Sequence, residues 1–99
     1  MHLDYFEAGA DIAISASYQA TLRGLAARGV RAAEARRLIS SSVALARSAR
    51  DRFLADQELA ENRPVPLIAG SIGPFGAHLH DGSEYSGNYG VTSNVIRDF

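Results

Sequence analysis

Asp11-Ile-Ala-Ile-Ser-Ala-Ser-Tyr-Gln-Ala20 is one of the two stretches that decide the fold, and Pro66-Leu-Ile-Ala-Gly-Ser-Ile-Gly-Pro-Phe75 is the other. Each begins with a short apolar run that predicts a strand, Ile12 to Ile14 in the first and roughly Leu67 to Ser71 in the second. Because the runs are apolar at successive positions, they suit a sheet that is covered on both faces. Each stretch then ends in small and polar residues, so polar side chains gather where the strands end.

A long amphipathic helix is predicted between the two strands, from about Arg31 to Gln57. Val30 and Arg31 offer no side chain that could cap its start. Strand, helix and strand form a βαβ unit with parallel strands, whose polar ends lie on the side where α/β folds bind ligands. The apolar residues of the helix recur at spacings of three and four and form one stripe, which consists of Ala35, Leu38, Ile39, Val43, Ala46, Ala49 and Phe53.

The other segments are predicted to be short elements and loops. In chain order they are the end of a helix over 2–8 closed by Gly9, a loop with a short helical turn over 19–30, a polar connection over 58–64, a long glycine-rich loop over 73–90, and a helix over 94–99 capped by Thr92 or Ser93. Two strands and one covering helix leave both sheet edges unpaired and one face bare. We therefore do not expect the isolated 99-residue chain to be a stable monomer.

The composition is that of an ordinary globular protein, with 46% hydrophobic residues, 21% charged residues and a net charge of −1. No apolar run approaches the ~20 residues that cross a bilayer. The N-terminus, with Asp4 and Glu7, has no basic region typical of a signal peptide. We therefore expect a cytoplasmic protein without a membrane partner. The chain has no cysteine, so it cannot build a disulfide or a thiolate metal site by itself.

Positive charge is concentrated in residues 23–52, which hold eight arginines and only two acidic residues. A basic helix can bind nucleic acid. However, this segment contains no aromatic residue that could stack on bases. We therefore interpret it as a solvated helix face and expect no nucleic-acid partner.

Four polar residues, Ser15, Ser17, Tyr18 and Gln19, follow the first strand. Their hydroxyl, phenol and amide groups can orient a polar ligand, or they can bond to the local backbone. None is a base, and no Ser-His-Asp order is present. After the second strand, the glycines between Gly70 and Gly76 would let the backbone approach a ligand closely. Their spacing fits neither a phosphate loop nor a dinucleotide motif.

The polar residues of the glycine-rich loop allow several interpretations. His78 and His80 are predicted to be exposed loop residues rather than metal ligands, because only Asp81 and Glu84 lie nearby. Asp81 and Glu84 could act as acid and base, although a packed structural loop is the commoner role of such a cluster. The residues that could contact a ligand directly are Tyr85 and Tyr89.

Together these strings resemble the homocysteine S-methyltransferase family, most closely its bacterial and plant members that use S-methylmethionine as donor. The matching blocks occur in the order that the family uses and extend over nearly the whole chain. They are His2-Leu-Asp-Tyr-Phe-Glu-Ala-Gly-Ala-Asp11, Ser15-Ala-Ser-Tyr-Gln-Ala20, Ala27-Arg-Gly29, Leu67-Ile-Ala-Gly-Ser-Ile-Gly-Pro-Phe-Gly76 and Asp81-Gly-Ser-Glu-Tyr-Ser-Gly-Asn-Tyr-Gly90.

The resemblance implies that residues 1–99 are an N-terminal-half fragment of a homocysteine-binding (β/α)8 TIM barrel, covering about strands two and three with their crossover helix. It also implies a zinc-activated homocysteine thiolate that takes a methyl group from S-methylmethionine or a similar sulfonium donor, giving methionine. The zinc-binding cysteines of the family would lie beyond Phe99. No catalytic residue or metal ligand is therefore assigned to this chain, which we expect to be inactive alone. The residues assigned to the substrate pocket are Tyr18, Gln19, Ser71, Gly73, Pro74 and Tyr85.

Two alternatives stay open at this point. The chain could be a non-enzymatic remnant, or a binding or assembly fragment that completes a barrel with a partner chain. It could also belong to another βα-barrel enzyme that shares only the strand-end architecture.

Overall fold

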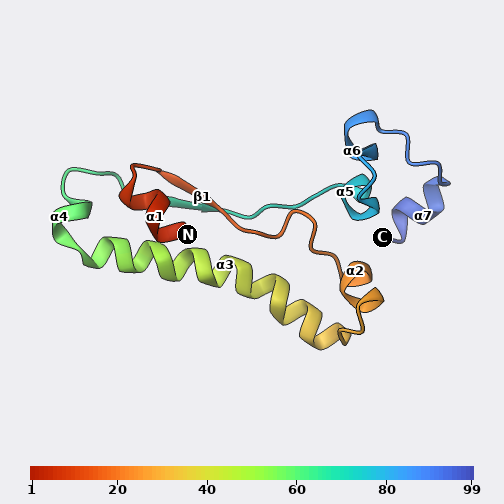
Figure 1. Ribbon diagram of the computed structural model, residues 1–99, viewed down its shortest axis with the longest axis horizontal. Helices are drawn as coiled ribbons and strands as arrows, with labels where there is room; N and C mark the ends of the chain where they lie inside the picture. The colour runs from red at the N-terminus through yellow and green to blue at the C-terminus, as the bar shows by residue number, and fades with distance from the viewer.

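The computed structural model describes the backbone of residues 1–99 and every side chain except that of Gln57. The molecule is elongated, with extents of 53 × 31 × 18 Å (Figure 1). Its elements are α1 (His2–Glu7), β1 (Ile12–Ile14), α2 (Leu22–Ala27), α3 (Ala32–Ala55), α4 (Gln57–Ala60), β2 (Leu67–Ala69), α5 (Phe75–Leu79), α6 (Ser83–Ser86) and α7 (Ser93–Arg97). None of the helices in this described chain is long and apolar enough to span a bilayer.

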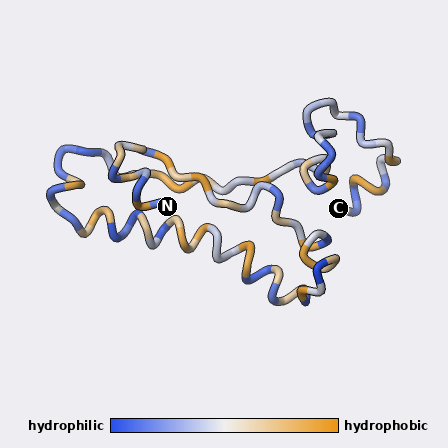
Figure 2. The backbone as a smooth tube through the Cα atoms, viewed as in Figure 1, coloured by the Kyte–Doolittle hydropathy of each residue, from blue (hydrophilic) through white to orange (hydrophobic). Residues whose placement is uncertain are grey.

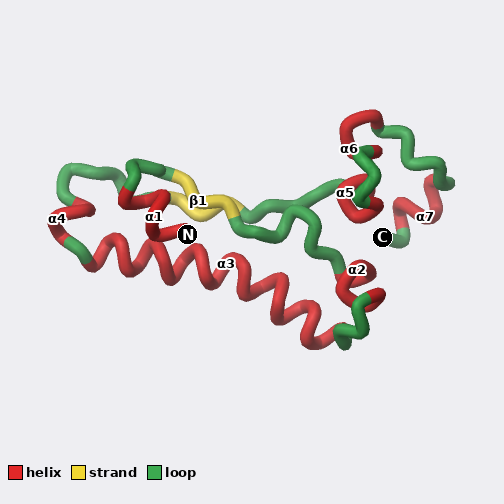
Figure 3. The backbone as a smooth tube through the Cα atoms, viewed as in Figure 1, coloured by secondary structure: helices red, strands yellow, loops and turns green.

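The two strands pair in parallel, which confirms the predicted βαβ unit with α3 as its crossover helix. Ile12 pairs with Leu67, and Ile14 pairs with Ala69. Backbone hydrogen bonds extend the pairing at both ends, from Leu67 N to Asp11 O at 2.9 Å and from Ser15 N to Ala69 O at 2.9 Å. Figure 3 shows the strands side by side, and Figure 2 shows that they form an apolar stretch, with hydrophilic segments toward α4.

One face of the sheet carries the core and the other face is bare. Ala13 is buried with Phe6 of α1 and Phe53 of α3, and the two phenyl rings lie 5.8 Å apart between centroids. On the opposite face, Ile12 is 55% exposed and Leu67 is 63% exposed. The apolar runs suit a sheet covered on both faces, but one covering helix was predicted to leave one face bare, and the described chain does cover only one face.

Helix α3 confirms the predicted apolar stripe, with one exception. Ala35, Ala46 and Phe53 are buried on it, whereas Leu38 is 48% exposed. Leu38 and Leu45 instead line an open cavity against the start of the chain, because α1 is too short to cover this part of α3. As predicted, no side chain caps the start of the helix.

Two segments that were predicted to be irregular contain short helices. The polar connection begins with α4, whose first turn is held by Asp56 Oδ1, which accepts hydrogen bonds from the N–H groups of Glu58 and Leu59. The long loop over 73–90 contains α5 and α6. Gly82 and Gly87 flank α6 with left-handed backbone angles that suit glycine. Four- and five-residue helices are too short to show a helical period in the sequence.

Arg63 connects the segment that precedes β2 to the segment that precedes β1. Its guanidinium donates hydrogen bonds to the carbonyl oxygens of Phe6 at 2.6 Å and Ala10 at 3.2 Å, and it contacts Asp11 Oδ1 at 3.1 Å. The same group lies over the ring of Phe53, 5.1 Å from its centroid. The planar guanidinium therefore fixes the approach to β1 against the approach to β2.

Candidate functional site

A closed ring of hydrogen bonds joins the ends of the two strands. The N–H of Ser71 donates to Ser15 Oγ at 2.9 Å, and Ser17 Oγ donates to the carbonyl oxygen of Ser71 at 2.8 Å. The hydroxyl oxygens of Ser15 and Ser17 are 2.8 Å apart. Because Ser17 has already given its only hydroxyl hydrogen to Ser71, the bond between the hydroxyls runs from Ser15 to Ser17. Both serines are buried, so the ring holds the two polar segments in one fixed arrangement.

Gly73 lies directly against the carbonyl of Tyr18. A Cβ atom placed on Gly73 would lie 2.1 Å from the carbonyl oxygen of Tyr18, which no real side chain can tolerate. Glycine is therefore required for a close approach, as the sequence suggested, but the group it approaches is the backbone of the facing strand end. Gly70 differs, because a Cβ atom there would meet nothing within 4 Å.

The predicted pocket residues fall into three groups. Tyr18, Ser71 and Gly73 share a cavity of about 260 Å³ at the strand ends. Gln19 lines a neighbouring cavity of about 250 Å³. The two remaining predicted residues lie outside both linings: Pro74 is an exposed residue directly before α5, and Tyr85 is 89% exposed on α6.

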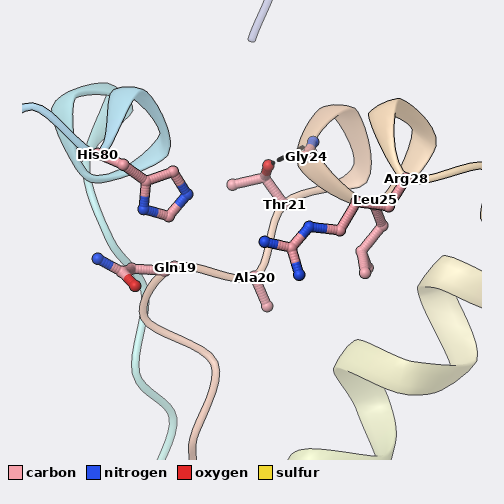
Figure 4. Close-up of a pocket in the computed structure, with 7 residues that line it drawn as sticks. All are labelled: Gln19, Ala20, Thr21, Gly24, Leu25, Arg28 and His80. Atoms are coloured by element: carbon pink, nitrogen blue, oxygen red, sulfur yellow. Dashed lines mark hydrogen bonds between the residues drawn. The ribbon is translucent and has the colours of Figure 1, made fainter.

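The neighbouring cavity contains two residues that were not assigned to the site from the sequence, Arg28 and His80. Figure 4 shows the guanidinium of Arg28 on one side of it and the side chains of Gln19 and His80 on the other. Arg28 is the residue directly after α2, and His80 is the residue directly after α5. The only sequence signal for Arg28 was its place in the block Ala27-Arg-Gly29.

His78 on α5 and His80, the residue directly after this helix, have different surroundings. His78 was predicted to be an exposed loop residue, but it is half-buried on the helix, with its Nδ1 3.1 Å from Thr21 Oγ1. This contact joins α5 to the start of α2, because Thr21 Oγ1 also accepts the N–H of Gly24 at 2.9 Å. His80 is exposed, as predicted. Among the described side chains, His, Asp and Glu nowhere gather in groups of three that could hold a metal ion.

Asp81 has a local structural role. Its Oδ1 accepts the N–H of Ser83 at 2.9 Å, which holds the first turn of α6. Hydrogen bonding from Ser83 lowers the pKa of the exposed Asp81 carboxyl below its usual value. A carboxylate that loses its proton more readily is a poorer proton donor near neutral pH, so the geometry favours the structural interpretation of this residue.

The family model described as homocysteine S-methyltransferase matches residues 1–99, the whole chain. The chain belongs to the homocysteine S-methyltransferase family. This confirms the resemblance on which the pocket residues were chosen, while the roles of the individual residues stay predictions.

Similar members of the family come from bacteria and plants. The chain is 58% identical over 99 residues to a homocysteine S-methyltransferase of Bacillus subtilis, covering all of this chain and 31% of that protein. It is 46% identical over 112 residues to a selenocysteine methyltransferase of Astragalus bisulcatus, covering 33% of it. It also superposes on the crystal structure of the metallated homocysteine methyltransferase MmuM from Escherichia coli with a TM-score of 0.84 and 51% identity, covering 99% of this chain and 33% of that one. The chain thus spans about a third of the length of its relatives.

Proposed function

We propose that residues 1–99 form part of the active site of a homocysteine S-methyltransferase that transfers a methyl group from S-methylmethionine or a similar sulfonium donor to homocysteine. The observation that carries this proposal is the family match over the whole chain, in a structure that joins the polar ends of two parallel strands. The similarity to a homocysteine S-methyltransferase and to a selenocysteine methyltransferase supports a sulfur or selenium acceptor. A cytoplasmic location is part of the proposal.

The reaction is a direct methyl transfer. The homocysteine thiol gives up its proton, and the thiolate sulfur attacks the methyl carbon. A new carbon–sulfur bond forms and the bond to the positively charged donor sulfur breaks, so that the donor leaves as a neutral thioether and methionine is formed. Such a step depends mainly on holding the two sulfur atoms in line with the methyl group. We assign this positioning role on the donor side to Tyr18, Ser71 and Gly73, which share a cavity, and to Gln19 beside it. Pro74 and Tyr85 stay predicted contacts.

The proposed setting is a (β/α)8 barrel to which residues 1–99 contribute two strands and their crossover helix. The rest of the barrel, or a partner chain, would cover the exposed face of Ile12 and Leu67. The zinc ion that the resemblance implies does not fit the described residues, because they include no cysteine and no cluster of metal-binding side chains. We therefore place its ligands outside residues 1–99.

A hybrid enzyme tests the proposed function. In it, residues 1–99 replace the matching segment of the Bacillus subtilis relative, and methionine formation from homocysteine and S-methylmethionine is measured. We expect activity within about tenfold of the unmodified relative, which corresponds to about 1.4 kcal/mol in the barrier. A folded hybrid that forms no methionine would refute the proposal.

A second candidate function rests on the bare face of the sheet. Ile12, Ile14 and Leu67 are each more than half exposed, as expected of a non-enzymatic fragment that assembles with a partner chain. The hybrid separates the two functions. An assembly fragment would restore the fold of the hybrid without restoring methyl transfer.

The serine ring gives a prediction for stability. Ser15→Ala leaves the N–H of Ser71 without its partner in a part-buried site, so we expect the free energy of unfolding of the hybrid to fall by about 1–3 kcal/mol. Ser41→Ala is the matched control, because that exposed hydroxyl bonds only to the carbonyl of Leu38 within α3. Urea unfolding measures both variants. Equal stability of the two would show that the ring does not hold the strand ends.

A further inference from the structure

The cavity beside the strand ends has one fixed charge and that charge is positive. No acidic side chain lines it, and its only guanidinium belongs to Arg28. Within the described chain, that guanidinium makes no hydrogen bond or ion pair. Gln19 and His80 bring further hydrogen-bonding groups from the opposite side (Figure 4). An unpaired guanidinium facing other polar side chains across a cavity is suited to an anion.

The walls of this cavity are held in place by their own contacts. Thr21 joins the start of α2 to His78 on α5, so the two helices that directly precede Arg28 and His80 are linked. His80 has a left-handed backbone, with φ at 56°, which is costly for a residue other than glycine. His80 therefore occupies a backbone conformation that glycine would adopt at lower energy.

We propose that this cavity binds the carboxylate of an α-amino-acid substrate, with Arg28 as the principal partner and His80 beside it. The proposal rests on the proposed function, since homocysteine and a donor such as S-methylmethionine both carry an α-carboxylate. A guanidinium presents two parallel N–H donors that match the two oxygens of a carboxylate. At about 250 Å³ the cavity is smaller than a pocket for a drug-sized molecule and suits a small polar group.

The ends of the two helices do not outweigh the charge of Arg28. Residues from both ends of α2 line the cavity, and His80 lies directly after the C-terminal end of α5, where the backbone carries partial negative charge. These helices have only six and five residues, so the partial charge is small beside the full charge of a guanidinium.

Binding to the hybrid enzyme, measured by calorimetry, tests the proposal independently of turnover. The ligands are S-methylmethionine, homocysteine, and the amine analogue of each that lacks the carboxylate. We expect Arg28→Met to weaken binding of one of the two amino acids by about 10- to 100-fold and to leave its amine analogue unaffected. The amino acid that loses affinity identifies which substrate occupies the cavity.

Three further variants control for structural effects. Arg28→Lys keeps the charge and should recover part of the affinity. His80→Gly removes the imidazole where glycine suits the backbone, and should weaken binding without lowering the melting temperature. Arg36→Met removes an exposed arginine of α3 and should leave the affinity for both amino acids unchanged. Undiminished binding of both amino acids to Arg28→Met, or an equal loss for the amines, would overturn the proposal. A hybrid enzyme that binds the amino acids through Arg28 but forms no methionine would count against the proposed function alone.

Discussion

Gly73→Ala is expected to lower kcat/KM of the hybrid enzyme by about 100-fold, the loss typical of a displacement near 1 Å in an active site. The added methyl group would lie 2.1 Å from the carbonyl oxygen of Tyr18 and 3.0 Å from the Cβ atom of Ala77. The obstruction is backbone, so rotation of a side chain cannot relieve it. Tyr18 also follows Ser17, which is held by the serine ring, so the two strand ends must move apart.

Gly70→Ala is the matched control for this prediction. It adds the same methyl group three residues earlier, where nothing lies within 4 Å. We expect its activity to stay within about a factor of two of the unsubstituted hybrid, as for surface substitutions that change stability by less than 0.5 kcal/mol. Steady-state kinetics and melting temperature should be measured for both variants. Equal activities would show that contact between Gly73 and Tyr18 does not shape the site.

The isolated 99-residue chain is expected to show no cooperative unfolding as a monomer and no methyl transfer. Its radius of gyration is 17.0 Å, against about 13 Å for a compact domain of this size. The two-stranded sheet leaves Ile12, Ile14 and Leu67 exposed on one face, and so short a sheet is at best marginally stable. Burial of the small cluster of Phe6, Ala13 and Phe53 stabilises the fold too little to offset the conformational entropy lost when the whole chain is ordered.

Sedimentation velocity combined with thermal circular dichroism measures this prediction. We expect either a monomer with a broad, featureless transition or a concentration-dependent assembly that covers the bare face. The hybrid enzyme is the control, because the same residues are expected to unfold cooperatively within it. A sharp transition in a proven monomer would contradict the prediction.

The parts of the fold that could be predicted from the sequence are those with a long or unambiguous pattern. The strand Ile12–Ile14 and the start of β2 at Leu67 were predicted correctly, because apolar runs bounded by polar residues identify strands well. Helix α3 was predicted within two residues at each end, because its stripe repeats over many turns. The second strand was predicted to reach Ser71, but the ladder ends at Ala69 and serine hydroxyls continue the connection.

The remaining features depend on contacts between distant segments. Leu38 is exposed because α1 is too short to cover it. The apolar pattern of α3 carries no information about the length of α1. The contact between Gly73 and Tyr18 requires the register of the two strands. Arg28 and His80 face one cavity only because α5 forms within a glycine-rich segment and ends in a left-handed residue. No local sequence pattern specifies that ending, since histidine is an unusual residue for it.

Mass spectrometry of the methionine formed by the hybrid enzyme from deuterated homocysteine and unlabelled S-methylmethionine tests the central claim most directly. If residues 1–99 are part of a homocysteine S-methyltransferase site, deuterated methionine should accumulate with the hybrid and stay absent with the isolated 99-residue chain. A well-folded hybrid that produces no deuterated methionine, while the unmodified Bacillus subtilis relative does so under the same conditions, would contradict the account.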